Sequence, residues 1–443
     1  MTARLGSTLI AAVVACSPLA ARAQVPPRPE PPLPLKHVRV TPSGKIWFAL
    51  AGIQRARVER DVNYLGGGDG TRTDNFGVSR TQLSIDLHLS PRTQIFAEAR
   101  DATARGRDLP GGTRSSDRDV WDWATLYLEQ STGFGDLKST LRAGRQELAL
   151  GRERIVSPSD FANVRRTFEG VTLNSIGARN TLTAFYAHPI VVRQTEHNIR
   201  DDNVTLWGVQ SAWKRPNAPA LLELYVFDKT TKKTATVPRA ERTLIGGRAV
   251  TPLGASKWLA EAEGGVQFGT TGTANVRAYM LATDFTRTFV ARWSPSLTFG
   301  ADWSTGTRAG RAPLSGTWDV FFPLGHAYTG YADLNGRRNL VELRGVLEAS
   351  PRQSIRLRAS GHAFRRASDA DAVYDDGGNV FRPSIAGAPR DIGKELDVTL
   401  QWRASRFFRF DVGGAVYAPG GFLRATGPAQ RYTWGFGSVT VTY

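Results

Sequence analysis

The last eight residues of the chain alternate between apolar and polar side chains and end on an aromatic residue. Val439, Val441 and Tyr443 fall on one face of an extended strand, and the serine and threonines between them fall on the other. A soluble domain gains little from an apolar strand that ends on a terminal tyrosine, whereas a membrane barrel needs a last lipid-facing strand to pair with its first. The terminus therefore suggests that the whole chain is a β-barrel.

Segments with the same period of two recur from Ile46 onward, separated by clusters of Gly, Pro, Asn, Asp and Ser. In residues 83–89, 355–359 and 396–402, one face is apolar and the other carries polar or charged side chains. Beyond the N-terminal segment, no stretch approaches the run of about 20 apolar residues that a spanning helix needs. The chain is therefore predicted to be all-β, although alternation alone fits a soluble sandwich as well as a membrane barrel.

Connection lengths separate these two alternatives. If the first strand rises from the periplasm, the expected periplasmic turns are all short and lie at 90–92, 132–136, 175–179, 215–219, 251–257, 294–296, 350–353 and 404–406. Most of the expected outside loops are long, and they lie at 59–78, 104–119, 151–167, 189–201, 306–338 and 366–392, with 269–272 as a short exception. Outer-membrane barrels have this asymmetry, so the sequence predicts a transmembrane antiparallel β-barrel of about 18 strands. Loops 306–338 and 366–392 are candidate plugs.

The N-terminal residues are expected to lie outside the barrel. Residues 1–23 contain an apolar run and end in Ala21-Arg22-Ala23, the pattern of a secretory signal peptide. Residues 24–41 are rich in proline and predict a stiff periplasmic leader, so the barrel is expected over 42–443. Cleavage before Cys16 and its lipidation is the alternative, and this single cysteine rules out a disulfide framework.

The chain is strongly basic, with 57 Lys and Arg residues against 40 Asp and Glu residues and a formal charge of +17. Such a charge suits nucleic acid, an anionic membrane surface or an acidic solute. Nucleic acid is not expected as a partner, because the sequence has no helix-turn-helix, zinc-finger or RNA-binding signature. The histidines lack zinc-site spacing and no catalytic constellation can be assembled, so no metal, no cofactor and no enzymatic activity are expected.

Strand parity places several arginines on faces that would line the lumen of a barrel. These are Arg100, Arg356, Arg358 and Arg403. Arginine suits the binding of a polymer with many carboxylates, because it keeps its charge and meets a carboxylate with two parallel hydrogen bonds. Glu98 and Asp397 are the expected counter-charges. The alternative is that these arginines only solvate a wide lumen or bind lipopolysaccharide phosphates near the rim.

Residues 144–151, GRQELALG, followed by Arg154, Asn163, Arg166 and the segment FEGV at 168–171, resemble the signature of the alginate export family of outer-membrane proteins. Residues 325–339 and 393–422 are also similar to patterns of that family. Two positions depart from the family pattern. Arg152 stands where the family usually has an acidic residue, and Glu169 stands where it has Asp.

The resemblance implies a barrel of about 18 strands that passes an anionic polysaccharide outward through an arginine-lined lumen. It adds Arg145, Arg154 and Arg166 to the expected lumen residues and Glu169 to the counter-charges.

The leading hypothesis is therefore an outer-membrane channel for an anionic, alginate-like polysaccharide or oligosaccharide. Outer-membrane lipid, lipopolysaccharide and periplasmic export proteins are the further expected partners. One alternative is a general or anion-selective uptake porin for small solutes. Another is an outer-membrane enzyme or polysaccharide-binding adhesin, which the missing catalytic constellation disfavours.

Overall fold

The computed structural model describes residues 35–443 except 67–71, 110 and 216–218. Eighteen antiparallel strands form one continuous wall. In chain order they are β2 (Trp47–Val62), β3 (Thr73–His88), β4 (Thr93–Arg105), β5 (Asp119–Phe134), β6 (Leu137–Gln146), β7 (Phe168–Ile176), β8 (Asn180–Val191), β10 (Val204–Lys214), β11 (Leu221–Thr231), β12 (Ala240–Pro252), β13 (Trp258–Thr271), β14 (Ala274–Thr288), β15 (Ser296–Ser304), β17 (Leu340–Arg352), β18 (Ile355–Arg366), β21 (Asp391–Arg403), β22 (Phe408–Pro419) and β23 (Tyr432–Thr442).

The wall closes where the first long strand meets the last. β2 pairs with β3 on one side and with β23 on the other, from Ile53↔Thr442 to Val62↔Thr433. Every long strand therefore has two neighbours, and none of them forms an open edge of the sheet. This confirms the predicted transmembrane antiparallel barrel and the pairing expected of the C-terminal strand.

Five short strands and three helical turns complete the described residues. They are β1 (Val38–Arg39), β9 (Ile199–Arg200), β16 (Leu314–Ser315), β19 (Val373–Tyr374), β20 (Val380–Arg382), η2 (Tyr64–Gly66), η3 (Gly254–Ser256) and α1 (Gly421–Thr426). No helix in the described part of the chain is both long and apolar enough to cross a membrane. β1 lies in the segment expected as a leader and pairs with β2. Residues 1–34, which include the expected signal peptide and most of that leader, lie outside the described residues.

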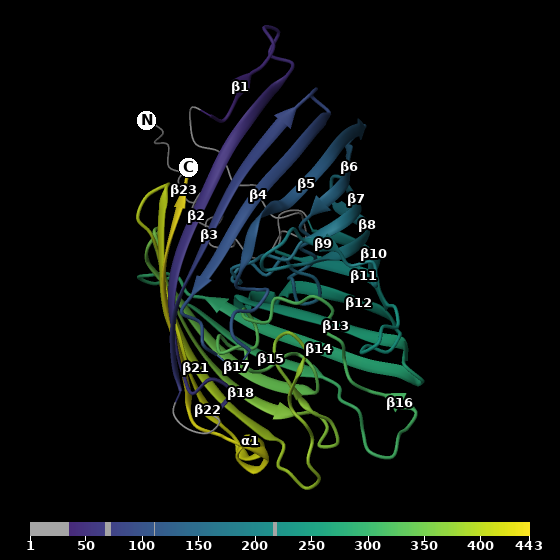
Figure 1. Ribbon diagram of the computed structural model, residues 1–443, viewed down its shortest axis with the longest axis vertical. Helices are drawn as coiled ribbons and strands as arrows, with labels where there is room; N and C mark the ends of the chain where they lie inside the picture. The colour runs from purple at the N-terminus through teal and green to yellow at the C-terminus, as the bar shows by residue number, and fades with distance from the viewer. Residues whose placement is uncertain (1–34, 67–71, 110, 216–218) are drawn as a thin grey trace, which may run out of the picture.

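The two ends of the barrel differ in their connections. β1 and the C-terminus lie toward the upper end in Figure 1, and α1, between β22 and β23, lies at the lower end. Seven short turns join the strands at the first end, at positions that the sequence predicts, and the eighth predicted turn, between β10 and β11, includes residues 216–218, which lie outside the described residues. We call the opposite end the loop end. It carries the long connections 147–167, 305–339 and 367–390. Large parts of these connections lie inside the wall (Figure 1).

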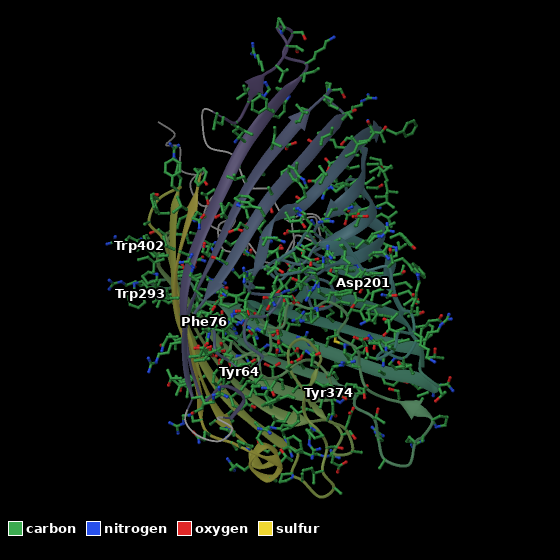
Figure 2. All side chains as sticks on the ribbon, viewed as in Figure 1. Tyr64, Phe76, Asp201, Trp293, Tyr374 and Trp402 are labelled. Atoms are coloured by element: carbon green, nitrogen blue, oxygen red, sulfur yellow. The ribbon has the colours of Figure 1, made fainter. Side chains whose placement is uncertain are left out.

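Alternation along each strand separates an outward apolar face from an inward polar face. On β3, Leu83 and Ile85 are 45% and 36% exposed, whereas Arg80 and Gln82 on the other face are 4% exposed. Trp293 and Trp402 lie at the outer edge of the wall in Figure 2 and are also well exposed. Apolar side chains therefore cover the outside of the barrel, as a lipid-facing wall requires.

Two of the three buried apolar clusters in the described residues form where loops pack against the inside of the wall. Val156 of the connection 147–167 and Trp318 of the connection 305–339, both fully buried, join inward side chains from β7 to β14. A second cluster joins loop residues such as Leu334 to Tyr417 and Trp434 on β22 and β23. The inward loops are therefore packed against the wall and do not hang free in the lumen.

Candidate functional site

Residues 147–167, which connect β6 to β7, run across the inside of the barrel, and we call them the strap. Near its C-terminal end, the strap is held by arginines of β2 and β3 through backbone carbonyl groups. Arg55 donates to the carbonyl oxygens of Asp160 at 3.0 Å and Ala162 at 2.9 Å. Arg57 donates to the carbonyl oxygen of Phe161 at 2.6 Å, and Arg80 donates to that of Ala162 at 3.2 Å.

The N-terminal half of the strap is held by carboxylates on β13 and β14. Arg154 donates to Glu261 at 2.8 Å, Glu263 at 2.9 Å and Asp284 at 2.7 Å. Burial by itself would lower the pKa of Arg154, but Tyr328 and the surrounding carboxylates raise it well above its usual value. Because β2 and β13 lie on nearly opposite sides of the ring of strands, these contacts stretch the strap across the lumen.

We call the inward carboxylates of β11 to β15 the acidic wall, and each of them is paired with an arginine. Its members are Glu223, Glu261, Glu263, Asp284 and Asp302. Arg344 of β17 bonds Asp284 at 2.6 Å and Asp302 at 2.8 Å. Arg337 reaches Asp302 at 2.6 Å, and Arg248 reaches Glu223 at 2.5 Å. The guanidinium groups on this side are therefore buried and already occupied.

Loop 305–339 fills the lumen beside the strap. Phe322 exchanges backbone hydrogen bonds with Ile155 at 2.9 Å and Ser157 at 2.8 Å. Loop 367–390 joins them through Asp371, which accepts hydrogen bonds from Thr307 at 2.8 Å and Thr317 at 2.5 Å. The two loops expected as plugs thus lie in the barrel, and the strap is a third plug element.

Arginines of β2, β18 and β22 line a cavity of about 390 Å³ inside the barrel. We call Arg356, Arg358 and Arg409 the arginine patch. The side chains of Arg356 and Arg409 are 40% and 39% exposed, and each has one carboxylate neighbour. Arg358 has no carboxylate within ion-pair distance among the described residues, and its guanidinium lies 5.8 Å from the ring centre of Tyr331. Phe161 and Phe436 complete the aromatic lining.

Arg100 and Glu98 face inward on β4, but both are buried. Arg100 is 1% exposed and donates to the carbonyl oxygen of Arg165 in the strap at 3.1 Å. Glu98 accepts a hydrogen bond from Gln82 at 2.8 Å. The structure therefore gives this pair a supporting position behind the strap.

Arg154 and Arg166 lie within the strap, and neither faces the cavity. Arg166 donates to the carbonyl oxygen of Ser157 at 2.9 Å, and burial lowers its pKa to about 10, so it stays charged at neutral pH. Arg152, the basic departure from the family pattern, bonds Glu261 at 2.6 Å. The signature arginines of this segment thus fix the plug.

Arg145 and Glu169 lie on the outward face of the wall, in contrast to the expected lumen position. On β6, Arg142 faces inward and pairs with Glu129 at 2.6 Å, so Arg145, three residues later, falls on the other face. Arg145 lies 3.8 Å from Glu169, which is its partner in the β6–β7 register. The short alternation before Arg145 in the sequence did not reveal this orientation.

Asp397 and Arg403 occupy inward positions of β21 at different heights. Asp397 accepts a hydrogen bond from Ser360 at 3.1 Å and lies 3.2 Å from His362. Arg403 is the last residue of β21 and is exposed at the end that holds β1 and the C-terminus. Of the residues expected from the sequence, only Arg356 and Arg358 meet at the cavity.

The sequence analysis missed several inward arginines that matter most to the site. They are Arg55, Arg57 and Arg80, which hold the strap, and Arg409, which lines the cavity. A usable signal was present on β2, where Arg55 and Arg57 alternate with Ala56 and Val58. That alternation orients the two arginines inward, although it does not reveal their partners.

The family model described as alginate export matches residues 47–436 of this chain. No match was found among curated protein sequences. Among solved structures, OpdQ of Pseudomonas aeruginosa superposes with a TM-score of 0.59 at 12% identity, covering 89% of this chain and 98% of that one. OccD3 (OpdP) of the same organism gives 0.58 at 10% identity and covers 97% of both chains.

OccK2 (OpdF) of Pseudomonas aeruginosa, solved in complex with glucuronate, gives a TM-score of 0.56 at 11% identity, covering 89% of this chain and 96% of that one. At these identities the likeness to solved structures concerns the fold.

Proposed function

Because this chain belongs to the alginate export family, we propose that it passes an anionic polysaccharide or oligosaccharide, selected by the arginine patch, across the bacterial outer membrane. Family and barrel together identify the protein as an outer-membrane channel. We assign the long loops to the extracellular side, because outer-membrane barrels have short periplasmic turns and longer outside loops. The identity of the solute and the role of the patch are the proposed part.

The observation that carries the proposal is the imbalance of charge around the lumen cavity. Its lining includes five arginines and three carboxylates, namely Arg55, Arg57, Arg356, Arg358, Arg409, Asp160, Glu348 and Asp411. A polyuronate presents a carboxylate on each sugar, and a guanidinium can bind it through two parallel hydrogen bonds. The neighbouring carboxylates keep this attraction weak enough for release, as conduction requires.

The aromatic lining supports a sugar as the solute. Phe161, Tyr331 and Phe436 line the cavity beside the arginine patch, and Phe161 and Tyr331 each stack one ring face on His326. Aromatic rings of this kind can pack against the apolar faces of a sugar ring. OccK2, a barrel of similar fold, was solved with glucuronate, which is a sugar carboxylate. Both observations favour a uronate-type solute over a small inorganic anion.

An uptake porin for small anionic solutes is the second candidate. The strap is clamped from two sides, and the cavity of about 390 Å³ has the size of a small-molecule pocket. This plug favours passage of one or two sugars at a time. The family and the porin-like neighbours indicate a channel rather than an enzyme.

Planar-bilayer recordings across a salt gradient test the role of the patch. The wild-type pore should prefer anions, and an Arg356→Gln/Arg358→Gln double variant should lose most of that preference. Arg277→Gln is the matched control, because Arg277 is exposed on the outward face of β14, away from the lumen. Cation preference in the wild type, or an equal loss in the control, would refute the proposal.

A second measurement separates the two candidates. For a polysaccharide channel, a linear oligouronate should block the current in a length-dependent manner, and liposomes should swell little with neutral sugars. Rapid swelling with neutral sugars and block that does not depend on oligouronate length would establish the porin instead.

A further inference from the structure

The outer wall has a hollow over the strands that close the barrel. Two adjoining depressions, of about 760 and 460 Å³, share Val58, Gly77, Arg105 and Gly437 in their lining. Strand register explains this continuity. Gly77 of β3 pairs with Val58 of β2 and Arg105 of β4, while Gly437 of β23 pairs with Val58 on the other side. Val58, 66% exposed, is therefore flanked by glycine on both neighbouring strands.

The packing of the barrel itself does not require these glycines. None of Gly77, Gly435 and Gly437 has a positive φ, and a Cβ atom on them would meet nothing closer than 3.9, 3.7 and 4.0 Å, respectively. At Gly52, by contrast, the ring of Tyr443 occupies the place of a side chain. Glycine inside a strand weakens it and often marks the close approach of another molecule. The hollow is thus space left open on the lipid-facing side.

The two ends of the hollow differ in chemistry. At the extracellular end lie Arg60 and Arg105, both exposed, together with Asn75. Arg60 donates to Asn75 at 3.1 Å, and neither arginine has a carboxylate within ion-pair distance in the described part of the chain. Toward the periplasm the lining is apolar, with Phe410 and Val412 among its members. The surface therefore offers a cationic head site above an apolar trough.

We propose that this hollow binds a phosphorylated, acylated glycolipid of the outer leaflet, of the lipid A type. A phosphate held by Arg60 and Arg105 would receive charge-assisted hydrogen bonds from two guanidinium groups that have no carboxylate partner among the described residues. An acyl chain would lie over Gly435, Gly437 and Gly77 and extend toward Phe410. Charge complementarity favours this occupant over a second copy of the chain, which would bring the same arginines face to face or expose them to hydrocarbon.

The height of the arginines fits the headgroup layer. Trp121 and Trp123, near the extracellular end of the adjacent β5, point outward and are 48% and 51% exposed. Outward tryptophans mark the membrane interface in barrels. Arg60 and Arg105 lie at the corresponding ends of β2 and β4, where the phosphates of outer-leaflet lipids are located.

Native mass spectrometry of the detergent-purified, full-length protein tests the proposal with lipid A, dephosphorylated lipid A and phosphatidylglycerol as probes. The wild type should prefer lipid A. An Arg60→Glu/Arg105→Glu variant should bind it about tenfold or more weakly, because it loses two charge-assisted contacts. The control variant Arg277→Glu changes an outward-facing side chain of β14, away from the hollow, and should bind lipid A as the wild type does.

A second variant tests the trough independently of charge. Gly437→Leu places a side chain in open space and should also weaken lipid A binding without preventing folding, as heat-modifiable migration on gels would show. Equal binding of dephosphorylated lipid A or of phosphatidylglycerol would overturn the proposal. So would a dimer in the wild type that Gly437→Leu abolishes, because a second copy would then fill the hollow. The ion selectivity of these variants should stay unchanged, so the result is independent of the proposed channel function.

Discussion

Two sides of the same lumen use arginine in different ways. Along the acidic wall, Arg154 and Arg344 are 1% and 6% exposed, and each bonds two or more carboxylates. In the arginine patch, Arg356 is 40% exposed with a single carboxylate partner, and Arg358 has none within ion-pair distance among the described residues. In the first set, Arg154 fastens the strap to the wall and Arg344 links wall carboxylates of neighbouring strands. The second set remains accessible to a solute.

The difference teaches that residue type and inward orientation do not define a binding group in a barrel. A guanidinium that is buried among carboxylates has its donors occupied, and removing it leaves unpaired charges that are costly to bury. A guanidinium beside water keeps its donors for an incoming anion, and its removal costs little stability. Partners and access to water decide between these roles.

The strongest test of the comparison is Arg154→Met. This change leaves Glu261, Glu263 and Asp284 without their shared partner, so the free energy of unfolding should fall by about 3–5 kcal/mol. The strap should also lose its hold on this side, and single-channel conductance should rise. Urea unfolding in lipid vesicles measures the first effect, and bilayer recording measures the second. Arg358→Met is the matched control and should leave stability nearly unchanged. Equal destabilisation by both variants would erase the distinction.

A double-mutant cycle of Arg154→Met with Glu263→Gln measures the coupling energy of one buried ion pair, which can be compared with that of an exposed pair. Because the two side chains are 2.9 Å apart, removing both should cost less than the sum of the single changes, with a coupling of about 0.5–3 kcal/mol. The corresponding cycle of Arg356→Met with Glu348→Gln, also an ion pair but exposed, should give about 0.2–1 kcal/mol. Similar coupling in both cycles would mean that burial does not separate the two sides.

The smallest expected effect comes from salt. Raising the ionic strength from about 0.1 M to 1 M shortens the Debye length from about 10 Å to 3 Å. Anion preference should therefore decline, because the arginine patch faces water. The urea concentration at the midpoint of unfolding should change little, because the ion pairs of Arg154 are buried. Reversal potentials and unfolding curves over the same salt series provide the measurement. A midpoint that falls along with selectivity would show that solvent reaches the acidic wall.

The wall of the barrel could be predicted because its determinants are local. Leu83 and Ile85 alternate with polar residues over a few positions, and each periplasmic turn is short and rich in turn-forming residues. The inward orientation of Arg356 and Arg358 follows from the same alternation. Arg145 shows the limit of this method, because the residues before it alternate too briefly to orient it.

The arrangement of the loops and side chains inside the barrel could not be predicted, because it depends on contacts between distant parts of the chain. Arg154 meets Asp284 across 130 positions of sequence, and Arg55 reaches Ala162 across 107. No periodic pattern encodes such a meeting, since it depends on the path of a loop through a closed wall.

The sequence by itself determined a β-barrel of about 18 strands, its lipid-facing side and the end that carries the long loops. These features follow from a two-residue period and from turn chemistry. The tertiary structure alone decided which arginines are occupied and which are free. A guanidinium is available to a solute only where closure of the barrel leaves it beside water and without a full set of carboxylate partners.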